Sequence, residues 1–477
     1  MTKIEKPGQA EARGDTRPRA RERSGAASGG PLAGARGVAT IVLHRVATDA
    51  AYATRALDAE ISKAGLSPRD ARLATEIVYG ALRMLPEIDA ALDQHLTRGR
   101  PDPFTFAALR AATYQAQVLS RVPSFAIVQE TVALVKQKRG EGLAKLTNAV
   151  LRRIVANRPE EPVAPTSMTV PAWVEGSLRA GIGEARMRAY LELTQRPPPL
   201  SLRVKPGLDR AELAARLRAA APDAEVRESE LTEDAILAWG VGDPRRLAGY
   251  EAGSFSVQDE GAELVGRLAD AQPGERVLDA CAGRGGKTLQ LLEAVGPSGH
   301  VTAVDVHARK LEQLQEEVTR LGYDLSRVST ETVDLSVGDG GLAGGFDRVV
   351  VDAPCTGLGT LRRRPEILLR LRAEDPARMA ALQLRILRCA AGLLRPGGVL
   401  VFAVCSGTLE EGRGIAEALE GRLPGLRRLV AGVPKVSVPC DGDGVFRIGP
   451  WLAREGGCPD VYQVVRWEML DSHVGPI

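Results

Sequence analysis

Residue patterns that mark several common kinds of site are missing from this sequence of 477 residues. Its six cysteines stand at least 16 positions apart, so neither a CxxC pair nor a zinc-ribbon spacing is present. The five histidines include no HxxxH pair, and we therefore predict no metal site. No run of 18 apolar residues occurs, which argues against a membrane-spanning helix. We expect a cytoplasmic protein with free thiols and no attachment to a membrane.

An excess of charge of one sign is also missing. Lys and Arg number 63 and Asp and Glu number 60, a net charge of +3, which does not identify a partner. The distribution of charge is more informative, because residues 1–37 hold eight Lys or Arg against four acidic residues and contain mostly small residues. This composition predicts a disordered basic tail. The tail has no apolar h-region, which argues against a secretory signal.

The pattern of apolar residues predicts an all-helical region over residues 38–158. Leu73, Ile77, Leu82 and Leu85 fall near one helical face. Ser124 follows a proline and is placed to cap the next helix.

Two further regions follow the helical one. Residues 159–255 predict a proline-rich linker and a small α+β segment, with a helix near 173–195 and a short alternating strand after the stretch "RPPPL". From 256 to 472, short apolar runs alternate with helices. Alternation of this kind predicts an α/β Rossmann-like domain with a doubly wound parallel sheet. Such sheets bind ligands at the carboxyl ends of their strands, so the residues that follow each apolar run are the candidates for function.

A glycine-rich turn, "LDACAGRGGKT" (278–288), joins a predicted strand to a predicted helix. Glycines let backbone amides approach a ligand, and the start of a helix favours an anionic group. The GxxxxGK[ST] pattern fails at Cys281, and the GxGxxG pattern fails at Thr288. Asp305 ends the next predicted strand, where a carboxylate can accept both ribose hydroxyls. The combination indicates an adenosine ligand without a polyphosphate, such as S-adenosylmethionine; a tight turn with a helix cap is the alternative.

Two cysteines follow apolar runs that are consecutive in the chain. Asp352 and Cys355 end the run in "VVVDAPCTGLGTLRRRPE" (349–366), and Cys405 ends the next one in "VLVFAVCSGTLEEG" (399–412). If these strands are neighbours, both thiols and the carboxylate face one crevice. A thiolate that adds to carbon 6 of a pyrimidine makes carbon 5 nucleophilic, and an acid near nitrogen 3 stabilises the charge that develops. Residues 362–364, three arginines, are expected to supply a positive field and phosphate contacts, with a solvated loop as the alternative.

These motifs resemble a known family. "SVQDEGAELVGRLADAQPGERVLDACAGRGGKT", "DAPCTGLGTLRRRPE" and "VCSGTLEEG" resemble the Sun/RsmB family of 16S rRNA cytosine-5 methyltransferases. "IVYGALR" and "NAVLRRI" in the helical region are similar to the NusB-type RNA-binding domain of its bacterial ribosomal member. The resemblance covers about residues 40–470. It implies an S-adenosylmethionine-dependent enzyme, monomeric, whose partner is RNA of the small ribosomal subunit, with the small α+β segment also contributing to RNA binding.

The resemblance also implies roles for matching residues. Cys405 would be the nucleophile, Cys355 would assist elimination and product release, and Asp352 would contact the cytosine. The residues expected to hold S-adenosylmethionine are Cys281, Ala282, Gly283, Arg284, Gly285, Gly286, Lys287, Asp305, Asp334 and Asp352.

The chain departs from the family at several positions. The family usually has Pro, Thr and Asn where this chain has Arg284, Val404 and Gly412. An Asp-Gly-Phe-Phe pattern near the end is here "DVYQ" (460–463). Because both cysteines are kept, we expect activity.

Two other functions are considered. One is a non-catalytic RNA-binding or ribosome assembly factor that keeps a relic methyltransferase fold, against which the intact pair of Cys355 and Cys405 argues. The other is a nucleotide-binding oxidoreductase, which the failed GxGxxG pattern disfavours.

Overall fold

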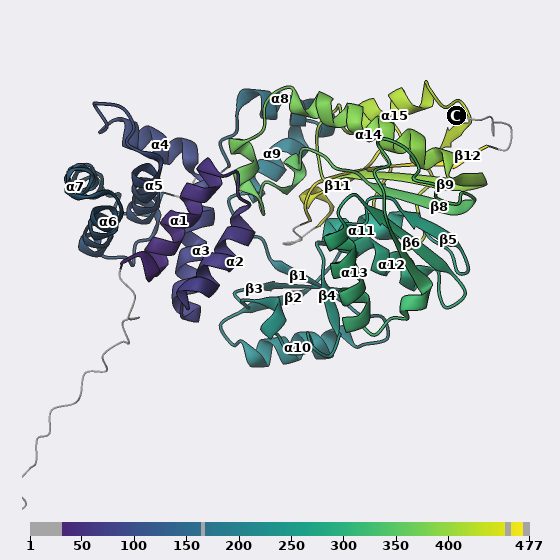
Figure 1. The fold of residues 1–477 in the computed structure, drawn as a ribbon, viewed down its shortest axis with the longest axis horizontal. Coiled ribbons are helices and arrows are strands. Elements are labelled where there is room, and N and C mark those ends of the chain that lie inside the picture. Colours follow the sequence, from purple (N-terminus) through teal and green to yellow (C-terminus); the bar gives the residue numbers. More distant parts are fainter. Residues whose placement is uncertain (1–30, 164–166, 454–458, 471–477) are drawn as a thin grey trace, which may run out of the picture.

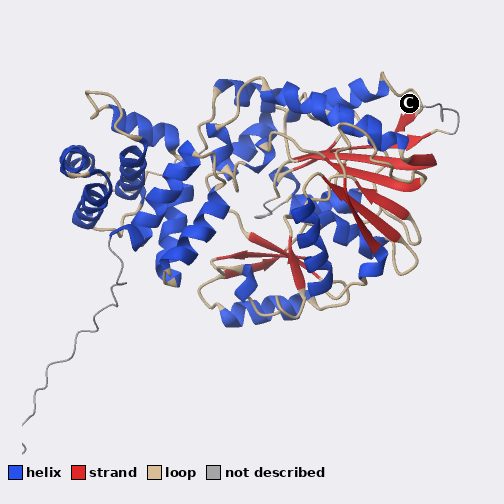
Figure 2. Cartoon of the chain, viewed as in Figure 1, coloured by secondary structure: helices blue, strands red, loops and turns tan. Residues whose placement is uncertain are grey.

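A helical part, a small mixed part and a larger α/β part follow one another along the chain (Figure 1). The computed structural model describes residues 31–163, 167–453 and 459–470. Figure 2 shows the strands gathered into two separate sheets, with helices alone in the N-terminal part. The predicted fold class is confirmed. None of the helices in the described ranges is long and apolar enough to cross a membrane.

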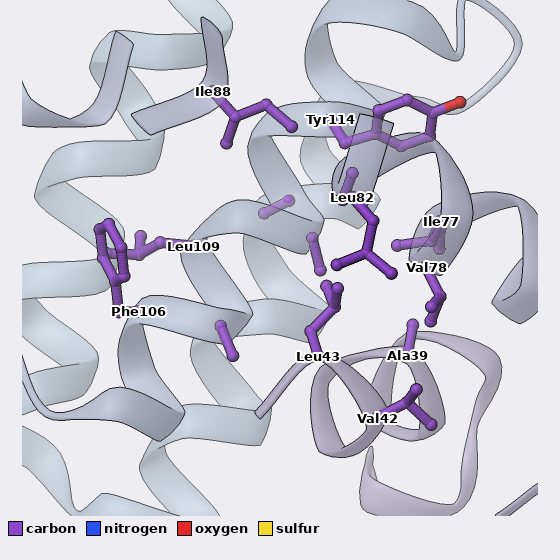
Figure 3. Packing of buried hydrophobic residues seen from close by; sticks show 14 of the residues in the cluster. Ala39, Val42, Leu43, Ile77, Val78, Leu82, Ile88, Phe106, Leu109 and Tyr114 are labelled. Atoms are coloured by element: carbon purple, nitrogen blue, oxygen red, sulfur yellow. The ribbon is translucent and has the colours of Figure 1, made fainter. Parts of the chain in front are cut away.

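The helical part has a large apolar core and a smaller apolar cluster around Phe104 and Leu134. Its elements are the short 3-10 helix η1 (Pro31–Ala33) and the helices α1 (Ala35–Thr48), α2 (Ala53–Ala64), α3 (Pro68–Arg83), α4 (Leu85–Asp93), α5 (Pro103–Val118), α6 (Ser124–Arg139) and α7 (Glu141–Ala156). Figure 3 shows side chains of α1, α3, α4 and α5 meeting in this core, among them Leu43, Leu82, Ile88 and Leu109. Tyr114 also lies there, and its hydroxyl donates a hydrogen bond to Glu76 Oε1 (2.5 Å), so its polar end has a partner.

Three details of the predicted helical region need correction. The predicted tail covers residues 1–30, which lie outside the described residues, and also 31–37, which belong to η1 and the first turn of α1. Ser124 does not cap α6, since Pro123 occupies the cap position and Ser124 Oγ accepts a hydrogen bond from Arg158 Nη1 (3.1 Å). Leu85 does not continue the helix of Ile77, because α3 ends at Arg83 and Leu85 begins α4.

The small mixed part begins with two helices, α8 (Ala172–Ile182) and α9 (Glu184–Leu193), in place of the single helix predicted near 173–195. A four-stranded antiparallel sheet of order β2-β3-β1-β4 follows, and one helix, α10 (Arg210–Ala220), lies between β1 and β2 in the chain. The strands are β1 (Leu200–Val204), β2 (Glu225–Glu228), β3 (Ala235–Trp239) and β4 (Phe255–Val257).

Strand β1 alternates in sequence but not in burial. Ser201 and Arg203, the polar residues of the alternation, are as buried as their apolar neighbours. Arg203 bridges to Glu293 (2.6 Å) and donates to Gln258 Oε1 (2.9 Å), and both partners belong to the α/β part. The polar face of β1 is therefore covered by the next part of the chain, and it is not a solvated face as alternation usually indicates.

The α/β part is a three-layer structure. Its elements are α11 (Glu260–Leu268), β5 (Arg276–Asp279), α12 (Gly286–Ala294), β6 (His300–Asp305), α13 (Ala308–Arg320), β7 (Val328–Thr332), β8 (Phe346–Asp352), α14 (Asp375–Gly392), β9 (Leu394–Val404), α15 (Arg413–Glu420), β10 (Leu426–Arg428), β11 (Phe446–Ile448) and β12 (Tyr462–Met469). One face of its sheet packs on α11, α12 and α13, and the other on α14 and α15 (Figure 1).

The sheet is mixed and not purely parallel. Strands β5 to β9 pair in parallel, in the order β9-β8-β5-β6-β7, as the alternation of strands and helices predicts. Three antiparallel strands, β10, β11 and β12, were not predicted, and β12 pairs directly with β9. The strand that carries Cys405 at its end therefore has β8 on one side and β12 on the other.

The structure predicts that truncation at residue 31 and truncation at residue 38 differ in effect. Arg36 donates hydrogen bonds to Gln115 Oε1 and Glu130 Oε2 (both 2.7 Å), and Ala35 is buried in the helical core. A chain that begins at residue 38 loses these contacts, so we expect its apparent free energy of unfolding to fall by about 1–3 kcal/mol. A chain that begins at residue 31 should unfold like the full chain in urea. Equal stability of the two truncated chains would contradict this placement of α1.

Candidate active site

Asp352, Cys355 and Cys405 come together at the carboxyl ends of two neighbouring strands. Strands β8 and β9 are parallel, and their register pairs Asp352 with Ala403, two residues before Cys405. The sulfur atoms of Cys355 and Cys405 are 3.3 Å apart, within hydrogen-bond distance. The prediction that these residues face one crevice required the two strands to be neighbours. In the structure β8 and β9 are neighbours.

The neighbours of Cys355 disfavour ionisation of its thiol. The hydrogen bond with Cys405, then burial, then the charges of Cys405, Glu411 and Asp352 raise the pKa of Cys355 well above its usual value. Cys355 is therefore protonated at neutral pH and can donate its S–H to the sulfur of Cys405.

A lysine pairs with the carboxylate that follows β8. Lys287, in the first turn of α12, donates to Asp352 Oδ2 at 2.6 Å. Burial opposes the charge on Lys287, but the charges of Asp352, Asp279 and Cys405 and the hydrogen bond to Asp352 outweigh it and raise the pKa of Lys287. The Lys287 ammonium also lies 5.6 Å from the ring centre of Tyr462, the first residue of β12. Lys287 is thus a buried cation at the meeting point of three strand ends.

The buried carboxylate of Glu411 joins the two loops that carry the cysteines. From the Cys355 loop, Thr356 donates to it through its backbone N–H (2.8 Å) and its hydroxyl (2.5 Å). From the Cys405 loop, the hydroxyls of Ser406 (2.6 Å) and Thr408 (3.1 Å) donate to Oε2. Gln383 of α14 adds a bond from its amide nitrogen (3.1 Å). Glu411 is 0 % exposed, so water cannot replace it as the acceptor for these donors.

Sequence reasoning missed Glu411. It stands in "TLEEG", where two adjacent glutamates resemble an ordinary solvated helix start. Only its neighbour fits that description, because Glu410 is exposed and accepts a hydrogen bond from Ser177 (3.1 Å). The hydroxyl residues at 356, 406 and 408 were the available signal, since buried carboxylates need several donors.

The helices α8 and α9 support the same two loops. Tyr190 of α9 is buried, and its hydroxyl donates to Leu358 O (2.8 Å) and accepts from Leu361 N (2.8 Å), in the loop after Cys355. Leu178 of α8 packs in the same apolar cluster as Leu358 and Leu361. The segment in which the sequence indicated no chemistry therefore holds the loop that carries Cys355.

For Arg362 and Arg363 the structure contradicts both expectations for residues 362–364, the phosphate contacts and the alternative of a solvated loop, because both side chains are bonded within the protein. Arg362 is buried and donates to the backbone oxygens of Arg196 (2.9 Å) and Pro197 (2.7 Å). Arg363 bridges to Asp259 (2.6 Å) and Asp460 (3.1 Å). These two residues attach the loop to the small mixed part and to the segment before β12, and only Arg364 is exposed.

The departure at Gly412 has a structural counterpart on β12. A Cβ atom at position 412 would lie 2.1 Å from Gln463 Oε1, so a larger residue fits there only if the Gln463 side chain moves. Gln463 donates from its amide nitrogen to Ser406 O (3.1 Å) and Thr408 O (2.7 Å), the backbone of the loop after Cys405. Gln463, itself a departure from the family pattern, thus fills the space beside Gly412. Val404 is fully buried in β9, and the structure gives no further reason for that departure.

The predicted cofactor residues lie along the ends of β5, β6, β7 and β8, with Asp352 at the end of β8. The turn from Cys281 to Lys287 follows β5, with Arg284 exposed on it. Asp305, at the end of β6, accepts hydrogen bonds from Gly283 N (3.0 Å) and His307 N (2.9 Å) and pairs with Lys310 (3.2 Å).

Two aspartates complete this edge. Asp334, after β7, is exposed and accepts from Ser336 N (2.9 Å) within its own turn. Asp279 is buried under the glycine-rich turn, where it accepts from the Thr288 hydroxyl (2.7 Å) and burial raises its pKa to about 6.

Open space beside the glycine-rich turn fits an adenosine ligand. Gly283 has φ 57°, and no atom lies within 4 Å of the position that a Cβ would take there. The backbone N–H of Gly283 and the carboxylate of Asp305 border this space, which suits a ribose. In the described ranges, no group of three or more His, Cys, Asp and Glu side chains is arranged to hold a metal ion.

Comparisons with known proteins agree with the fold and the motifs. Residues 267–424 match the family described as 16S rRNA methyltransferase RsmB/F, and residues 33–156 match the NusB family. A probable ribosomal RNA small subunit methyltransferase B from Bacillus subtilis is 33% identical over 78% of this chain and 84% of its own. A ribosomal RNA small subunit methyltransferase B from Xylella fastidiosa is 36% identical over 74% of this chain and 83% of its own.

Solved structures show the same fold. The crystal structure of the protein PH0851 has a TM-score of 0.75 at 22% identity and covers 91% of this chain and 98% of its own. NSun6 from Pyrococcus horikoshii, solved with SFG, has a TM-score of 0.53 at 16% identity and covers 64% of this chain and 99% of its own.

The two adjacent glutamates allow a matched test of the buried carboxylate. Glu411→Gln keeps the shape of the side chain but turns one acceptor into a donor that faces other donors, so we expect the apparent free energy of unfolding to fall by about 1–3 kcal/mol. Glu410→Gln, at the surface, should change it by less than about 0.5 kcal/mol. Urea denaturation of both variants measures the difference. Equal effects would show that Glu411 does not hold the loops together.

Proposed function

The chain belongs to the RsmB/F family of 16S rRNA methyltransferases, and on this premise we propose that it methylates carbon 5 of a cytosine in the RNA of the small ribosomal subunit. The observation that carries the proposal is the pair of sulfur atoms 3.3 Å apart beside the ion pair of Asp352 and Lys287. The family relationship supplies the methyl donor, S-adenosylmethionine. The relatives' names support ribosomal RNA as the substrate class, and the thiols support carbon 5 as the position of attack.

Cys405 is the proposed nucleophile. Its sulfur forms a bond to carbon 6 of the cytosine, and the electron pair of the 5,6 double bond makes carbon 5 able to take the methyl group. Asp352, beside both thiols, contacts the base near nitrogen 3, where charge develops in this step. The cytosine reaches the site single-stranded or flipped out of a helix, because the reacting atoms are otherwise covered by stacking.

Cys355 is proposed to act in the second half of the reaction. After methyl transfer, the proton on carbon 5 must leave so that the electron pair can expel the sulfur of Cys405. Cys355 takes this proton after its own S–H proton has passed to water, or it positions the base that takes the proton.

The environment of Cys355 supports this order of events. Its pKa is raised first by its hydrogen bond to Cys405 and also by the charge of that residue. Once Cys405 is bonded to carbon, its sulfur carries no charge and this contribution disappears. Cys355 therefore ionises more easily after the covalent bond has formed than before it.

The proposed cofactor site consists of the turn from Cys281 to Lys287 with Asp305, Asp334 and Asp352. S-adenosylmethionine supplies an electrophilic methyl group when it is bound. Asp305 would accept the ribose hydroxyls, and the backbone amides of the turn would hold an anionic group of the ligand. Lys287 keeps Asp352 oriented between the cofactor turn and the thiols through their 2.6 Å bridge.

Replacing Asp305 tests the cofactor site. Asp305→Ala removes a charged acceptor for two hydroxyls, so we expect S-adenosylmethionine to bind more weakly by about 2–3 kcal/mol. Asp324→Ala is the control, because Asp324 is exposed and only caps the short helix of residues 325–327. Isothermal titration calorimetry measures both. Unchanged affinity for Asp305→Ala would remove this residue from the site.

Replacing each thiol tests the reaction itself. Cys405→Ala should form no covalent adduct and transfer no methyl group, while Cys355→Ala should transfer the methyl group and remain attached to its RNA. The control is Cys389→Ala, since Cys389 packs against an apolar cluster in α14. The measurement is a denaturing gel of each variant with deproteinised ribosomal RNA and labelled cofactor. A slow band for Cys405→Ala but not for Cys355→Ala would exchange the two roles. Undiminished methylation without a band in either variant would make both thiols structural.

The same assay tests the alternative of a non-catalytic RNA-binding factor, because in that case the wild type would transfer no methyl group.

A further inference from the structure

An exposed aromatic ring with three arginines lies where the helical part meets the loop that follows Cys355. We call Tyr52, Arg55, Arg364 and Arg370 the Tyr52 cluster. Tyr52 directly precedes α2 and is 47% exposed. The guanidinium carbons lie 4.8 Å (Arg370), 5.9 Å (Arg364) and 5.9 Å (Arg55) from the centre of its ring.

Contacts across the boundary hold the ring in place. Arg370 donates a hydrogen bond to Ala51 O, and Glu366 Oε1 accepts one from Ala53 N (3.2 Å). The residues on both sides of Tyr52 are thus bonded to the short helix of residues 365–369 and the arginine that ends it. The position of the ring relative to the loop after Cys355 is therefore set by the chain itself.

Two members of the cluster form no side-chain hydrogen bond or salt bridge within the part of the chain that the structure describes. Arg55 and Arg364 are exposed, and both lie against the ring of Tyr52. The charge of Arg364 also acts on the carboxylates of Glu366 and Asp460. A role in joining the two parts of the chain accounts for Arg370, which is bonded to Ala51, and for the contact of Arg364 with the ring. It does not account for Arg55, which lies in the same part as Tyr52, or for the exposure of Arg364 to solvent. Glu366, the nearest carboxylate of the loop, is buried and accepts from Ala53 N.

The combination of residues matches a surface for single-stranded nucleic acid. Bases stack on aromatic rings and on guanidinium planes without regard to sequence, and exposed arginines contact the phosphates between them. A protein partner would be expected to bring carboxylates to these arginines, and such a partner is the alternative that the test must exclude.

The cluster is connected to the catalytic loop through a short stretch of chain. Arg364 is nine positions after Cys355, and within this stretch Gly359 N donates to Cys405 O (3.0 Å). We propose that the Tyr52 cluster binds a nucleotide of the substrate RNA that flanks the target cytosine. A base stacks on Tyr52, and Arg55 and Arg364 contact its phosphates. This inference rests on the proposed function in taking RNA as the substrate.

The test compares variants of the full chain. Tyr52→Ala removes the ring, and Tyr52→Phe keeps it and removes only a hydroxyl that makes no hydrogen bond among the described residues. The double change Arg55→Ala with Arg364→Ala removes the two exposed charges. Arg216→Ala is the control, because this arginine is also exposed but lies on α10 of the small mixed part, paired with Glu212. The readouts are anisotropy of a fluorescein-labelled single-stranded RNA, calorimetry with S-adenosylmethionine, and methyl transfer to deproteinised ribosomal RNA.

We expect Tyr52→Ala to bind the RNA about 10-fold more weakly and to raise KM for RNA, with unchanged affinity for the cofactor. Tyr52→Phe and Arg216→Ala should behave like the wild type. The double arginine variant should bind more weakly and show a smaller dependence on salt.

Wild-type RNA binding by both Tyr52→Ala and the double arginine variant would overturn the proposal, and so would an equal loss in Arg216→Ala. If Tyr52→Ala melts at a lower temperature, the double variant decides, since the two arginine side chains are exposed and form no side-chain hydrogen bond or salt bridge among the described residues. If the wild type transfers no methyl group to RNA, the proposed function fails, while the binding comparison still decides for or against the cluster. Binding of a protein at this surface, with RNA affinity unchanged in every variant, would also overturn it.

Discussion

The arrangement of the site depends on the hydrogen bonds that both cysteine loops donate to the buried carboxylate of Glu411. Neighbouring parallel strands bring Cys355 and Cys405 to the same edge, but a strand end alone does not determine where the following loop goes. Donors from both loops converge on Glu411, and separating the loops would leave several buried polar groups without partners. This shared acceptor explains how two loops 50 residues apart in sequence keep their sulfur atoms 3.3 Å apart.

The other parts of the chain are attached to these same loops. Helix α9 bonds to the Cys355 loop through Tyr190, and the small mixed part is joined to it through the backbone oxygens that Arg362 contacts. The helical part reaches the loop through Glu366 and Arg370. The loop after Cys355, the thiol that is proposed to act in proton removal, is thus connected to both parts of the protein that precede the α/β part.

Sequence reasoning found the residues that follow strands and missed those that depend on contacts between distant segments. Apolar runs of alternating strands and helices placed Asp305, Asp352 and Cys405 correctly at strand ends, because the period of side chains and the topology of parallel sheets are local properties. The burial of Arg362 and the two ion pairs of Arg363 could not be predicted, since a run of arginines is solvated unless acceptors from other segments surround it. The burial of Glu411 was not predicted for the same reason. Strand β12 was not predicted because its partner, β9, is distant in sequence and the two strands pair antiparallel.

The central claim is that Cys405, and not Cys355, bonds to carbon 6 of the target base. It can be tested in the unmodified protein with RNA that carries 5-fluorocytidine, because fluorine at carbon 5 cannot leave as a cation and the covalent complex persists after methyl transfer. The measurement is mass spectrometry of peptides from the trapped complex. The account predicts a methylated fluoropyrimidine adduct on the peptide that contains Cys405. An adduct on the peptide that contains Cys355, or methylation of RNA with no adduct on either peptide, would contradict it.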